Sequence, residues 1–355
     1  MQRVYLHGSA VTTSWADADK CLQDLIFDCT TAALSDAGIA VADLDAVVLG
    51  AHDLVDGRGL TNMVTAPAAA AYLKDETRLG DDGAAAFVLA DARVRSGSAR
   101  TCLVVAWGRA SEGPVDRIAN ALFDPFTTRP LAMTEIGVSG LRATRALVEH
   151  SGYEQHRDAA AARRAVRPDQ PGRSSAPAWP LRTPELPVWS DVVAAAVLRD
   201  EPGGVEVLGV GMGTEPFELG DRDLLGLPAL RSASAQALAE AGCAISDVGV
   251  LELDGLTLFD EALAMEAVGA AATGEGMARC AEDPRLDPAG ASAVGYCAPA
   301  MGLVRIARAA RRLLDTEPGE RALASGSSVV AAQTQAAVVL GRVSDVNVNG
   351  NGGEK

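Results

Sequence analysis

An arginine-rich segment stands out in the middle of this sequence. Between residues 142 and 182 there are eight arginines and only four acidic residues, although the whole chain has a formal net charge of -16. Guanidinium groups bind phosphate and pyrophosphate through charge-assisted hydrogen bonds. The segment, with Arg163, Arg164 and Arg167 near its centre, therefore predicts a phosphate-binding site. The alternative is a solvated helix face on which these arginines pair with the neighbouring acids.

The cysteines and histidines do not predict a metal site. The six cysteines are scattered without a C-x-x-C pair, and the four histidines have no ligand spacing. Most cysteines are expected to be reduced, buried and structural. We therefore predict neither a metal centre nor a disulfide framework.

Composition restricts the partners of the protein. At 355 residues and 48% hydrophobic the chain can bury a large core. Its net charge of -16 repels nucleic acid and anionic membranes. Because the sequence has neither a signal segment nor a bilayer-length apolar run, we expect a cytoplasmic protein that binds no nucleic acid and no membrane.

A repeat at long range predicts the organisation of the chain. The heptapeptide Ala-Leu-Ser-Asp-Ala-Gly-Ile at 33–39 recurs as Ala-Leu-Ala-Glu-Ala-Gly-Cys at 237–243. Apolar runs follow at 46–49 and 250–253. Each copy predicts an amphipathic helix that ends at glycine, then a short turn and a buried strand. Two tandem α/β halves are the simplest explanation.

The same comparison predicts further matching elements. The first half should have strands at 4–11, 102–107 and 192–198 and a helix at 84–95, and the second half strands at 205–213, 321–326 and 336–340 and a helix at 303–314. We divide the chain into an N-terminal half (1–200), with an inserted cap at about 110–185, and a C-terminal half (201–343). The polar, glycine-rich tail (344–355) is expected to be disordered.

With its helices and strands in this order along the chain, the sequence resembles the thiolase superfamily over residues 3–343. The resemblance is greatest to the lipid-transfer or sterol-carrier branch of that superfamily. The matching landmarks are the helix and strand at 33–48, Ser-Gly-Ser-Ala-Arg (96–100), Ser-Gly-Tyr-Glu-Gln-His-Arg-Asp (151–158), Trp-Pro-Leu (179–181), the strand at 190–198 and Asp-Pro-Ala-Gly-Ala (287–291). Their order and spacing carry the resemblance. It implies an α/β thiolase fold with five layers, αβαβα, built from two pseudo-repeated halves.

The sequence departs from the family at the loops that do its chemistry. Thiolases place a nucleophilic cysteine before the buried helix of the first half, where this chain has Gly-Asp-Asp-Gly at 80–83. The family histidine is replaced by Tyr296, followed by Cys297, and the loop after the second-repeat strand begins at Asp254. If these positions correspond, no acyl-enzyme can form at the first loop.

The resemblance implies a different set of catalytic residues. Tyr296 would act as acid or base, assisted by Asp254 or Asp82, and Cys297 is the one thiol near them. The last loop would stabilise an enolate through Ser325 and Gly326. The alternative is that these residues have structural roles only. Tyr296 and Cys297 would then be packing residues, and the aspartates would only cap a helix or a turn.

Three functions are compatible with this pattern. One is a carbon–carbon lyase or condensing enzyme that resembles the steroid side-chain retro-aldolases, which need no nucleophile. The second is a catalytically inactive subunit that supports a thiolase, ketosynthase or acyltransferase partner, and the third is a scaffold for an acyl carrier. The resemblance implies no tightly bound cofactor, a thioester of coenzyme A or of a carrier protein as substrate, and the arginine-rich cap as the site for the nucleotide.

The resemblance also implies partner proteins. We expect a homodimer or a heterodimer with a thiolase paralogue. A small zinc-ribbon/OB-fold protein is a further expected partner, because such a protein would complete a site that looks incomplete in one chain.

Overall fold

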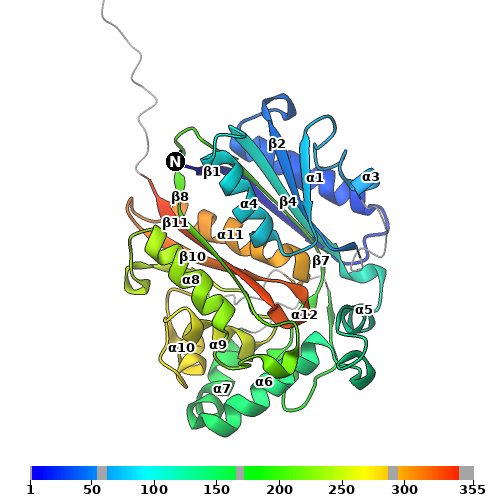
Figure 1. Cartoon of the computed structure of the whole chain (residues 1–355), viewed down its shortest axis with the longest axis vertical. Helices are drawn as coiled ribbons and strands as arrows, with labels where there is room; N and C mark the ends of the chain where they lie inside the picture. Colours follow the sequence, from blue (N-terminus) through cyan, green and yellow to red (C-terminus); the bar gives the residue numbers. More distant parts are fainter. Residues whose placement is uncertain (1, 54–61, 165–171, 287–294, 344–355) are drawn as a thin grey trace, which may run out of the picture.

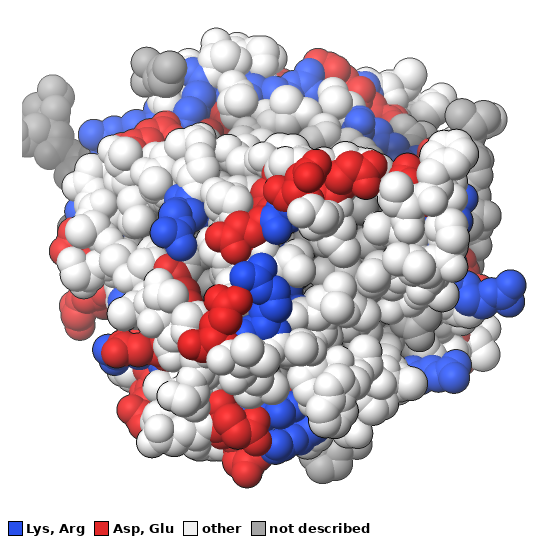
Figure 2. Space-filling model, turned by 60° about the horizontal axis from the view of Figure 1, so that its bottom comes forward, with Lys and Arg blue, Asp and Glu red and all other residues white. Residues whose placement is uncertain are grey.

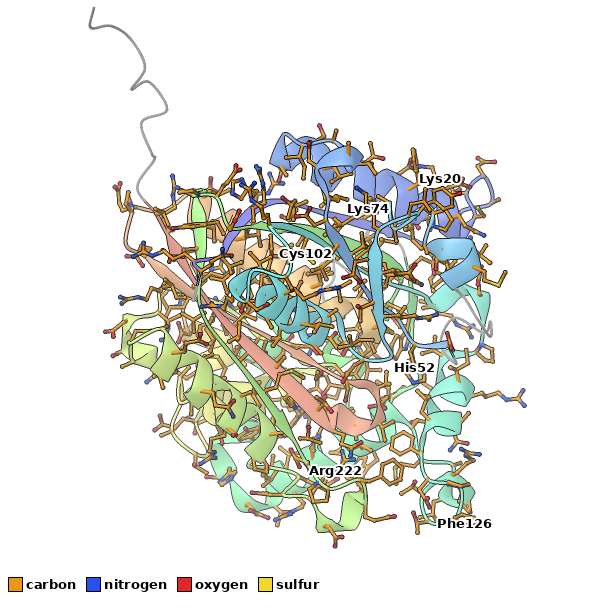
Figure 3. The ribbon with its side chains drawn as sticks, turned by 45° about the horizontal axis from the view of Figure 1, so that its top comes forward. Lys20, His52, Lys74, Cys102, Phe126 and Arg222 are labelled. Carbon is orange, nitrogen blue, oxygen red and sulfur yellow. The ribbon has the colours of Figure 1, made fainter. Side chains whose placement is uncertain are left out.

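A computed structural model describes residues 2–53, 62–164, 172–286 and 295–343 (Figure 1). Arg167, the landmark at 287–291 and the tail at 344–355 lie outside the described residues. In the described part, all six cysteines are free and four of them are buried. Cys102, for example, lies inside the first half (Figure 3).

The described residues form one sheet of nine strands and a two-stranded ribbon. The order across the large sheet is β3 (Asp75–Leu79), β2 (Ala46–Gly50), β4 (Thr101–Arg109), β7 (Asp191–Arg199), β1 (Tyr5–Ser14), β8 (Val205–Thr214), β11 (Thr334–Arg342), β10 (Arg321–Ser327) and β9 (Val250–Glu252). The ribbon pairs β5 (Arg173–Ser174) with β6 (Val188–Trp189). The predicted strands are thus all present.

The strand order is symmetric about the contact between β1 and β8. Reading outward gives β1-β7-β4-β2 on one side and β8-β11-β10-β9 on the other. On each side the outermost of these pairs is parallel and the others are antiparallel. The halves meet in a short antiparallel pairing of β1 with β8. This symmetry confirms the tandem halves predicted from the repeat.

Eleven α-helical segments accompany the sheet in the described residues. They are α1 (Leu22–Ala37), α3 (Asn62–Thr65), α4 (Gly83–Arg95), α5 (Val115–Leu122), α6 (Glu135–Glu149), α7 (Ser151–Arg163), α8 (Pro228–Glu240), α9 (Leu258–Ala267), α10 (Gly276–Glu282), α11 (Ala298–Leu314) and α12 (Val329–Ala332). Helices α1 and α8 cover the outer faces of the two halves, and α4 and α11 lie between the halves (Figure 1). The result is the predicted five-layer αβαβα arrangement.

The repeated helix–turn–strand segments are built alike. After α1 the chain turns at Gly38 with φ of 66°, and after α8 it turns at Gly242 with φ of 61°. A left-handed residue costs least when it is glycine, which explains the glycine in both copies. A single 3-10 turn follows in each copy and ends at Asp43 and at Asp247. Both carboxylates accept a hydrogen bond from the backbone N–H three residues earlier, at 2.8 and 2.9 Å.

Strands β2, β4 and β7 of the first half are buried on both faces. Along β4, Leu103 and Val105 belong to the apolar cluster under α1. Val104 and Ala106 belong to the larger cluster that includes α4 and α11. Successive side chains of a strand point to opposite faces, so a strand between two helical layers must be apolar throughout. This explains the unbroken apolar run seen in the sequence.

The segment between β4 and β7 contains α5, α6 and α7, at the position of the predicted cap. These helices lie with α9 and α10 at the lower end of the molecule in Figure 1. Helix α6 contacts α9 and α12, and helix α7 contacts α10. The insertion therefore covers the second half of the molecule.

Candidate active site

Three of the loops that carry candidate catalytic residues meet at one pocket. Asp254 follows β9, Ser327 ends β10, and Tyr296 precedes α11. All three line the pocket, together with residues of α6 and α9 from the cap side. The pocket thus lies between the second half and the insertion. The fourth loop, at 80–83, is not among the described residues that line it.

Asp254 is a buried carboxylate that keeps one oxygen unused. Ser327 Oγ donates a hydrogen bond to Oδ2, and the backbone N–H of Asp254 donates to Ser325 Oγ at 2.9 Å. Oδ1 is buried and has no hydrogen-bond partner in the described part of the chain. Burial raises the pKa of this carboxyl above its ordinary 3.8, while the Arg305 guanidinium and the Ser327 hydrogen bond oppose the rise. An unused acceptor on such a group is suited to taking a proton.

Tyr296 is held rigidly beside Asp254. Its N–H donates to Val188 O at 2.8 Å, and its carbonyl accepts from Ser190 N at 3.0 Å. Its ring packs edge-on against Trp189, with the ring centroids 5.6 Å apart. Burial, followed by the negative charges of Asp254 and Asp82, raises the pKa of the phenol well above its ordinary 10.0. Tyr296 therefore stays protonated at neutral pH and can donate a proton or a hydrogen bond.

Asp82 is the cap of α4. Its Oδ1 accepts from Ala84 N at 2.8 Å, and its Oδ2 accepts from Gly302 N at 2.9 Å in α11. Burial and the charge of Asp254 raise the pKa of Asp82 well above 3.8. Both oxygens are occupied by backbone donors, which is the geometry of the capping alternative. Asp82 therefore joins the two central helices, α4 and α11.

The other predicted site residues, Ser325, Gly326 and Cys297, do not line the pocket of Asp254 and Tyr296 in the described structure. Ser325 holds the backbone of Asp254, as described above. Gly326 lies opposite Ala336 in the β10–β11 ladder, and a Cβ at this position would lie 2.2 Å from Asp82 Oδ1. Cys297 is buried and lines a neighbouring apolar pocket. A Cβ on Gly108 would lie 2.2 Å from its Sγ, so the thiol is packed tightly against β4.

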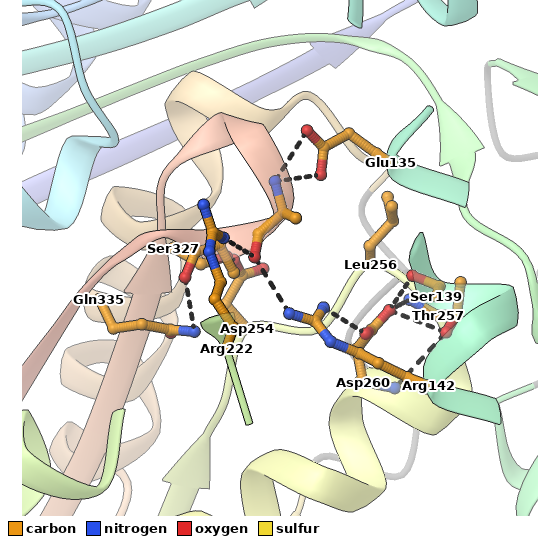
Figure 4. A network of polar contacts seen from close by, with 12 residues as sticks. Glu135, Ser139, Arg142, Arg222, Asp254, Leu256, Thr257, Asp260, Ser327 and Gln335 are labelled. Atoms are coloured by element: carbon orange, nitrogen blue, oxygen red, sulfur yellow. Dashed lines mark hydrogen bonds and ion pairs between the residues drawn. The ribbon is translucent and has the colours of Figure 1, made fainter. Parts of the chain in front are cut away.

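The sequence did not identify the polar network on the cap side of the pocket (Figure 4). Asp260 of α9 accepts hydrogen bonds from Ser139 Oγ at 2.5 Å and Thr257 Oγ1 at 2.8 Å. It also pairs with Arg142 Nη1 at 2.9 Å. The Thr-x-x-Asp spacing of residues 257–260 is a capping-box pattern that could have indicated the start of α9. Nothing in the sequence indicated that α6 would supply Ser139 and Arg142.

Glu135 was also missed, and it holds a left-handed turn at the edge of the pocket. Residues 330–332 all have positive φ, between 56° and 67°. The Val330 N–H donates to Glu135 Oε1 at 2.7 Å, and the Ala331 N–H donates to both carboxylate oxygens at 3.0 and 2.9 Å. Arg222 donates to the carbonyls of the same two residues at 3.0 and 3.2 Å. Non-glycine residues in this conformation are strained, so these contacts must maintain the turn.

The arginines of the cap make contacts within the chain. Arg163 donates to the carbonyls of Cys280, Asp283 and Leu286. Arg164 is 2% exposed and donates to Leu256 O at 3.0 Å. These two guanidinium groups hold α7 against the neighbouring segments. Acidic and basic side chains lie next to one another on the face shown in Figure 2, without one continuous basic surface.

The structure contributes two further findings about the described residues. They contain no group of three or more histidine, cysteine, aspartate or glutamate side chains arranged to hold a metal ion. None of their helices is long and apolar enough to cross a membrane.

Comparisons with solved structures identify the fold. A structure described as the Ltp2-ChsH2(DUF35) aldolase matches with a TM-score of 0.75 and 19% identity, over 97% of this chain and 99% of that one. The chain has the thiolase fold. Human mitochondrial 3-ketoacyl-CoA thiolase in complex with CoA matches this thiolase fold with a TM-score of 0.70 and 14% identity, over 96% of this chain and 98% of that chain.

A third structure has the same thiolase fold. It is a monomeric SCP2-thiolase like protein type 1 from Mycobacterium smegmatis, with a TM-score of 0.67 and 18% identity, over 95% of this chain and 77% of that one. No protein-family model and no curated protein sequence matches this chain. At these identities the comparisons establish the fold, and the function must be argued from the site.

Proposed function

We propose that this protein is a thiolase-like enzyme that cleaves or forms a carbon–carbon bond in an acyl thioester by aldol chemistry, without a covalent intermediate. The observation that carries the proposal is the unused Oδ1 of Asp254, a buried base candidate in a pocket that it shares with a protonated tyrosine. The absence of cysteine from loop 80–83 and the structural likeness to an aldolase both support it.

The site suits a retro-aldol cleavage of a β-hydroxyacyl thioester. Asp254 Oδ1 takes the proton of the β-hydroxyl group, and the β-carbon becomes a carbonyl as its bond to the α-carbon breaks. The electron pair of that bond forms the enolate of the shortened thioester. Tyr296 donates a hydrogen bond to this enolate, or its proton to the α-carbon, and later recovers a proton from Asp254 or water. Condensation is the same sequence in reverse.

The surroundings of Asp254 prepare it for this role. Hydrogen bonds to Ser327 and Ser325 fix the carboxylate and its backbone, so little reorganisation is needed during the reaction. Burial raises its pKa above the ordinary 3.8, which makes the ionised carboxylate a stronger base. Compared with the sequence-based interpretation, the proposed base moves from Tyr296 to Asp254, and Tyr296 becomes the acid.

The thioester carrier and the partners also remain proposals. A thiolase of the same fold has been solved with CoA, which supports coenzyme A as the carrier. A carrier protein is the other option. We further propose that the chain acts as a homodimer, as a heterodimer with a thiolase paralogue, or with a small zinc-ribbon/OB-fold protein, and that it works in the cytoplasm.

The second candidate is a catalytically inactive subunit that supports a partner thiolase or ketosynthase. The fully hydrogen-bonded Asp82 favours it, because the loop that carries the nucleophile in thiolases is here a structural link between α4 and α11.

Product analysis distinguishes the two candidates. Incubation with 3-hydroxybutyryl-CoA should release acetaldehyde and acetyl-CoA in equal amounts, and mass spectrometry should find no acyl adduct on residues 78–84 or on Cys297. An adduct on Cys297 would reinstate acyl transfer. Failure to cleave any β-hydroxyacyl thioester, with or without candidate partners, would favour the inactive subunit.

A further inference from the structure

The turn between β10 and β11 is built from residues that do not favour its conformation. Val330, Ala331 and Ala332 have φ of 67°, 58° and 56°. A residue other than glycine reaches this left-handed region only at a cost, and such residues normally occur singly. The turn closes at Ser328, whose N–H donates to Thr334 O and whose Oγ accepts from Thr334 N, both at 2.9 Å. Its strained part must therefore be imposed by contacts from other elements.

Charged side chains hold both the N–H groups and the carbonyls of this turn. Glu135, in the first turn of α6, accepts hydrogen bonds from the N–H groups of Val330 and Ala331. On the carbonyl side, Arg222 donates to Val330 O and Ala331 O, and Arg142 donates to Ala331 O at 3.0 Å. Removal of the Glu135 carboxylate would take this acceptor away from two N–H groups and allow the strained residues to relax.

The same turn adjoins the proposed base. Ser327, the last residue of β10, donates its hydroxyl hydrogen bond to Asp254. Ser328, Val329 and Ala332 line the pocket beside that carboxylate. A change in the backbone of the turn therefore moves both the hydroxyl group that orients Asp254 and one wall of the pocket.

We propose that Glu135 is a positioning residue, which imposes the left-handed turn and thereby fixes Ser327 against Asp254. The inference rests on the proposed function, because Asp254 is the base of that reaction. Both oxygens of Glu135 are occupied by N–H groups of the turn, so the carboxylate acts on the backbone. Glycine adopts the left-handed conformation without strain. A glycine in the turn should therefore make Glu135 less necessary, which would not be so if Glu135 exchanged protons with the substrate.

A pair of glycine substitutions tests the proposal. Glu135→Ala should lower kcat for 3-hydroxybutyryl-CoA by about 10- to 100-fold, with a smaller change in KM, because the base loses its orientation. Adding Ala331→Gly should recover about fivefold or more of this loss, since the left-handed conformation no longer costs free energy at that residue. Ala70 in the first half also has φ of 58° and does not line the pocket. Adding Ala70→Gly instead should recover less than about twofold.

The two glycines separate a positioning role from the alternatives. Equal recovery by Ala331→Gly and Ala70→Gly would mean that Glu135 only stabilises the fold, and no recovery by Ala331→Gly would mean that its carboxylate itself is required. Either result would overturn the inference. Glu135→Gln retains one acceptor oxygen, and it replaces Glu135→Ala as the starting variant if Glu135→Ala does not fold.

The titration of Asp254 provides a measurement that needs no turnover. Its carbon NMR signal, in protein labelled at the aspartate carboxyl groups, is assigned by its loss in Asp254→Asn. The hydrogen bond from Ser327 lowers the pKa of Asp254, so Glu135→Ala should raise this pKa and Ala331→Gly should reverse the rise. Loss of a nearby negative charge by itself would lower the pKa, which is the opposite direction. An unchanged or lowered pKa in Glu135→Ala would overturn the inference.

Failure of the proposed function would give a different result. In that case the unmutated protein cleaves no β-hydroxyacyl thioester, yet the pKa of Asp254 still rises in Glu135→Ala and returns with Ala331→Gly. Glu135 would then orient the carboxylate of a non-catalytic protein. Cleavage by the unmutated protein that Glu135→Ala leaves within about twofold, together with an unchanged titration of Asp254, would support the proposed function and reject the positioning role.

Discussion

The two halves of the molecule each place a buried aspartate near the centre, and the two aspartates differ in their hydrogen bonds. Asp82 is 3% exposed and Asp254 is 6% exposed, so burial does not distinguish them. Both oxygens of Asp82 accept backbone N–H groups, whereas Oδ1 of Asp254 has no partner in the described residues. The first geometry stabilises a helix end, and the second leaves an acceptor available for chemistry.

This comparison shows how a repeated fold can separate structure from function. In the first half, the loop before α4 has become a link to α11 through Asp82 and Gly302. In the second half, the loops after β9 and β10 keep a pocket open beside the insertion. A carboxylate at either place would look similar in the sequence, and only its partners reveal its role.

The largest expected effect concerns activity. Asp254→Asn keeps the size of the side chain and removes its basicity, so turnover of a β-hydroxyacyl thioester should fall by about 10²–10⁴. The melting temperature should change by only a few degrees. A matched control is Asp91→Asn, which alters a buried carboxylate outside the pocket and should leave kcat nearly unchanged. Steady-state kinetics of the two folded variants check this prediction.

The second prediction concerns Tyr296, the proposed proton and hydrogen-bond donor. Tyr296→Phe removes only the hydroxyl group and should lower turnover by about 10² or more, because the enolate loses its donor. Ring packing against Trp189 should persist, and with it the near-ultraviolet circular dichroism spectrum. Turnover within a few-fold of the unmutated protein would remove Tyr296 from the mechanism.

A smaller effect is expected in stability. Asp82→Asn leaves one of the two backbone donors without an acceptor, so the free energy of unfolding should fall by about 1–3 kcal/mol. Denaturant titration of this variant and of Asp254→Asn measures the difference. The larger loss of stability is expected for Asp82→Asn and the larger loss of activity for Asp254→Asn. A larger loss of stability for Asp254→Asn together with a larger loss of activity for Asp82→Asn would contradict the roles assigned to the two aspartates.

The pH dependence of stability gives the smallest effect. Burial raises the pKa of Asp82 above the 3.8 of an unfolded chain, so the folded state binds this proton more tightly. Its contribution to stability is complete below that ordinary value and is lost as pH rises through the raised pKa of the folded state. Asp82→Asn should therefore flatten the decline in stability from pH 4 upward. Denaturation midpoints at several pH values check this, and an unchanged slope would contradict it.

The repeat made most of the fold predictable. Its signals are local: a glycine after each helix, an aspartate in each 3-10 turn and an apolar run for each strand. These features are determined by a few neighbouring residues, so they can be read without knowledge of the whole structure. The positions of Asp254 and Tyr296 at a shared pocket also followed from the predicted loops.

The chemistry of the site was less predictable because it depends on distant segments. Glu135 and Arg142 lie in α6, within an insertion that has no counterpart in the other half, so the repeat could not indicate them. Similarly, the raised pKa of Tyr296 depends on charges from separate parts of the chain. The contacts of Arg163 could not be predicted for the same reason, since its acceptors lie more than 100 residues away.

Chemical rescue tests the central claim most directly. Asp254→Ala removes the proposed base and leaves space for a small carboxylate beside Ser327. Added formate should then restore turnover of a β-hydroxyacyl-CoA in a saturable manner, with a recovery that depends on formate being ionised. Asp82→Ala should show no such recovery, because its carboxylate serves only the backbone. If formate does not restore the folded Asp254→Ala variant, or restores the two variants equally, Asp254 is not the base.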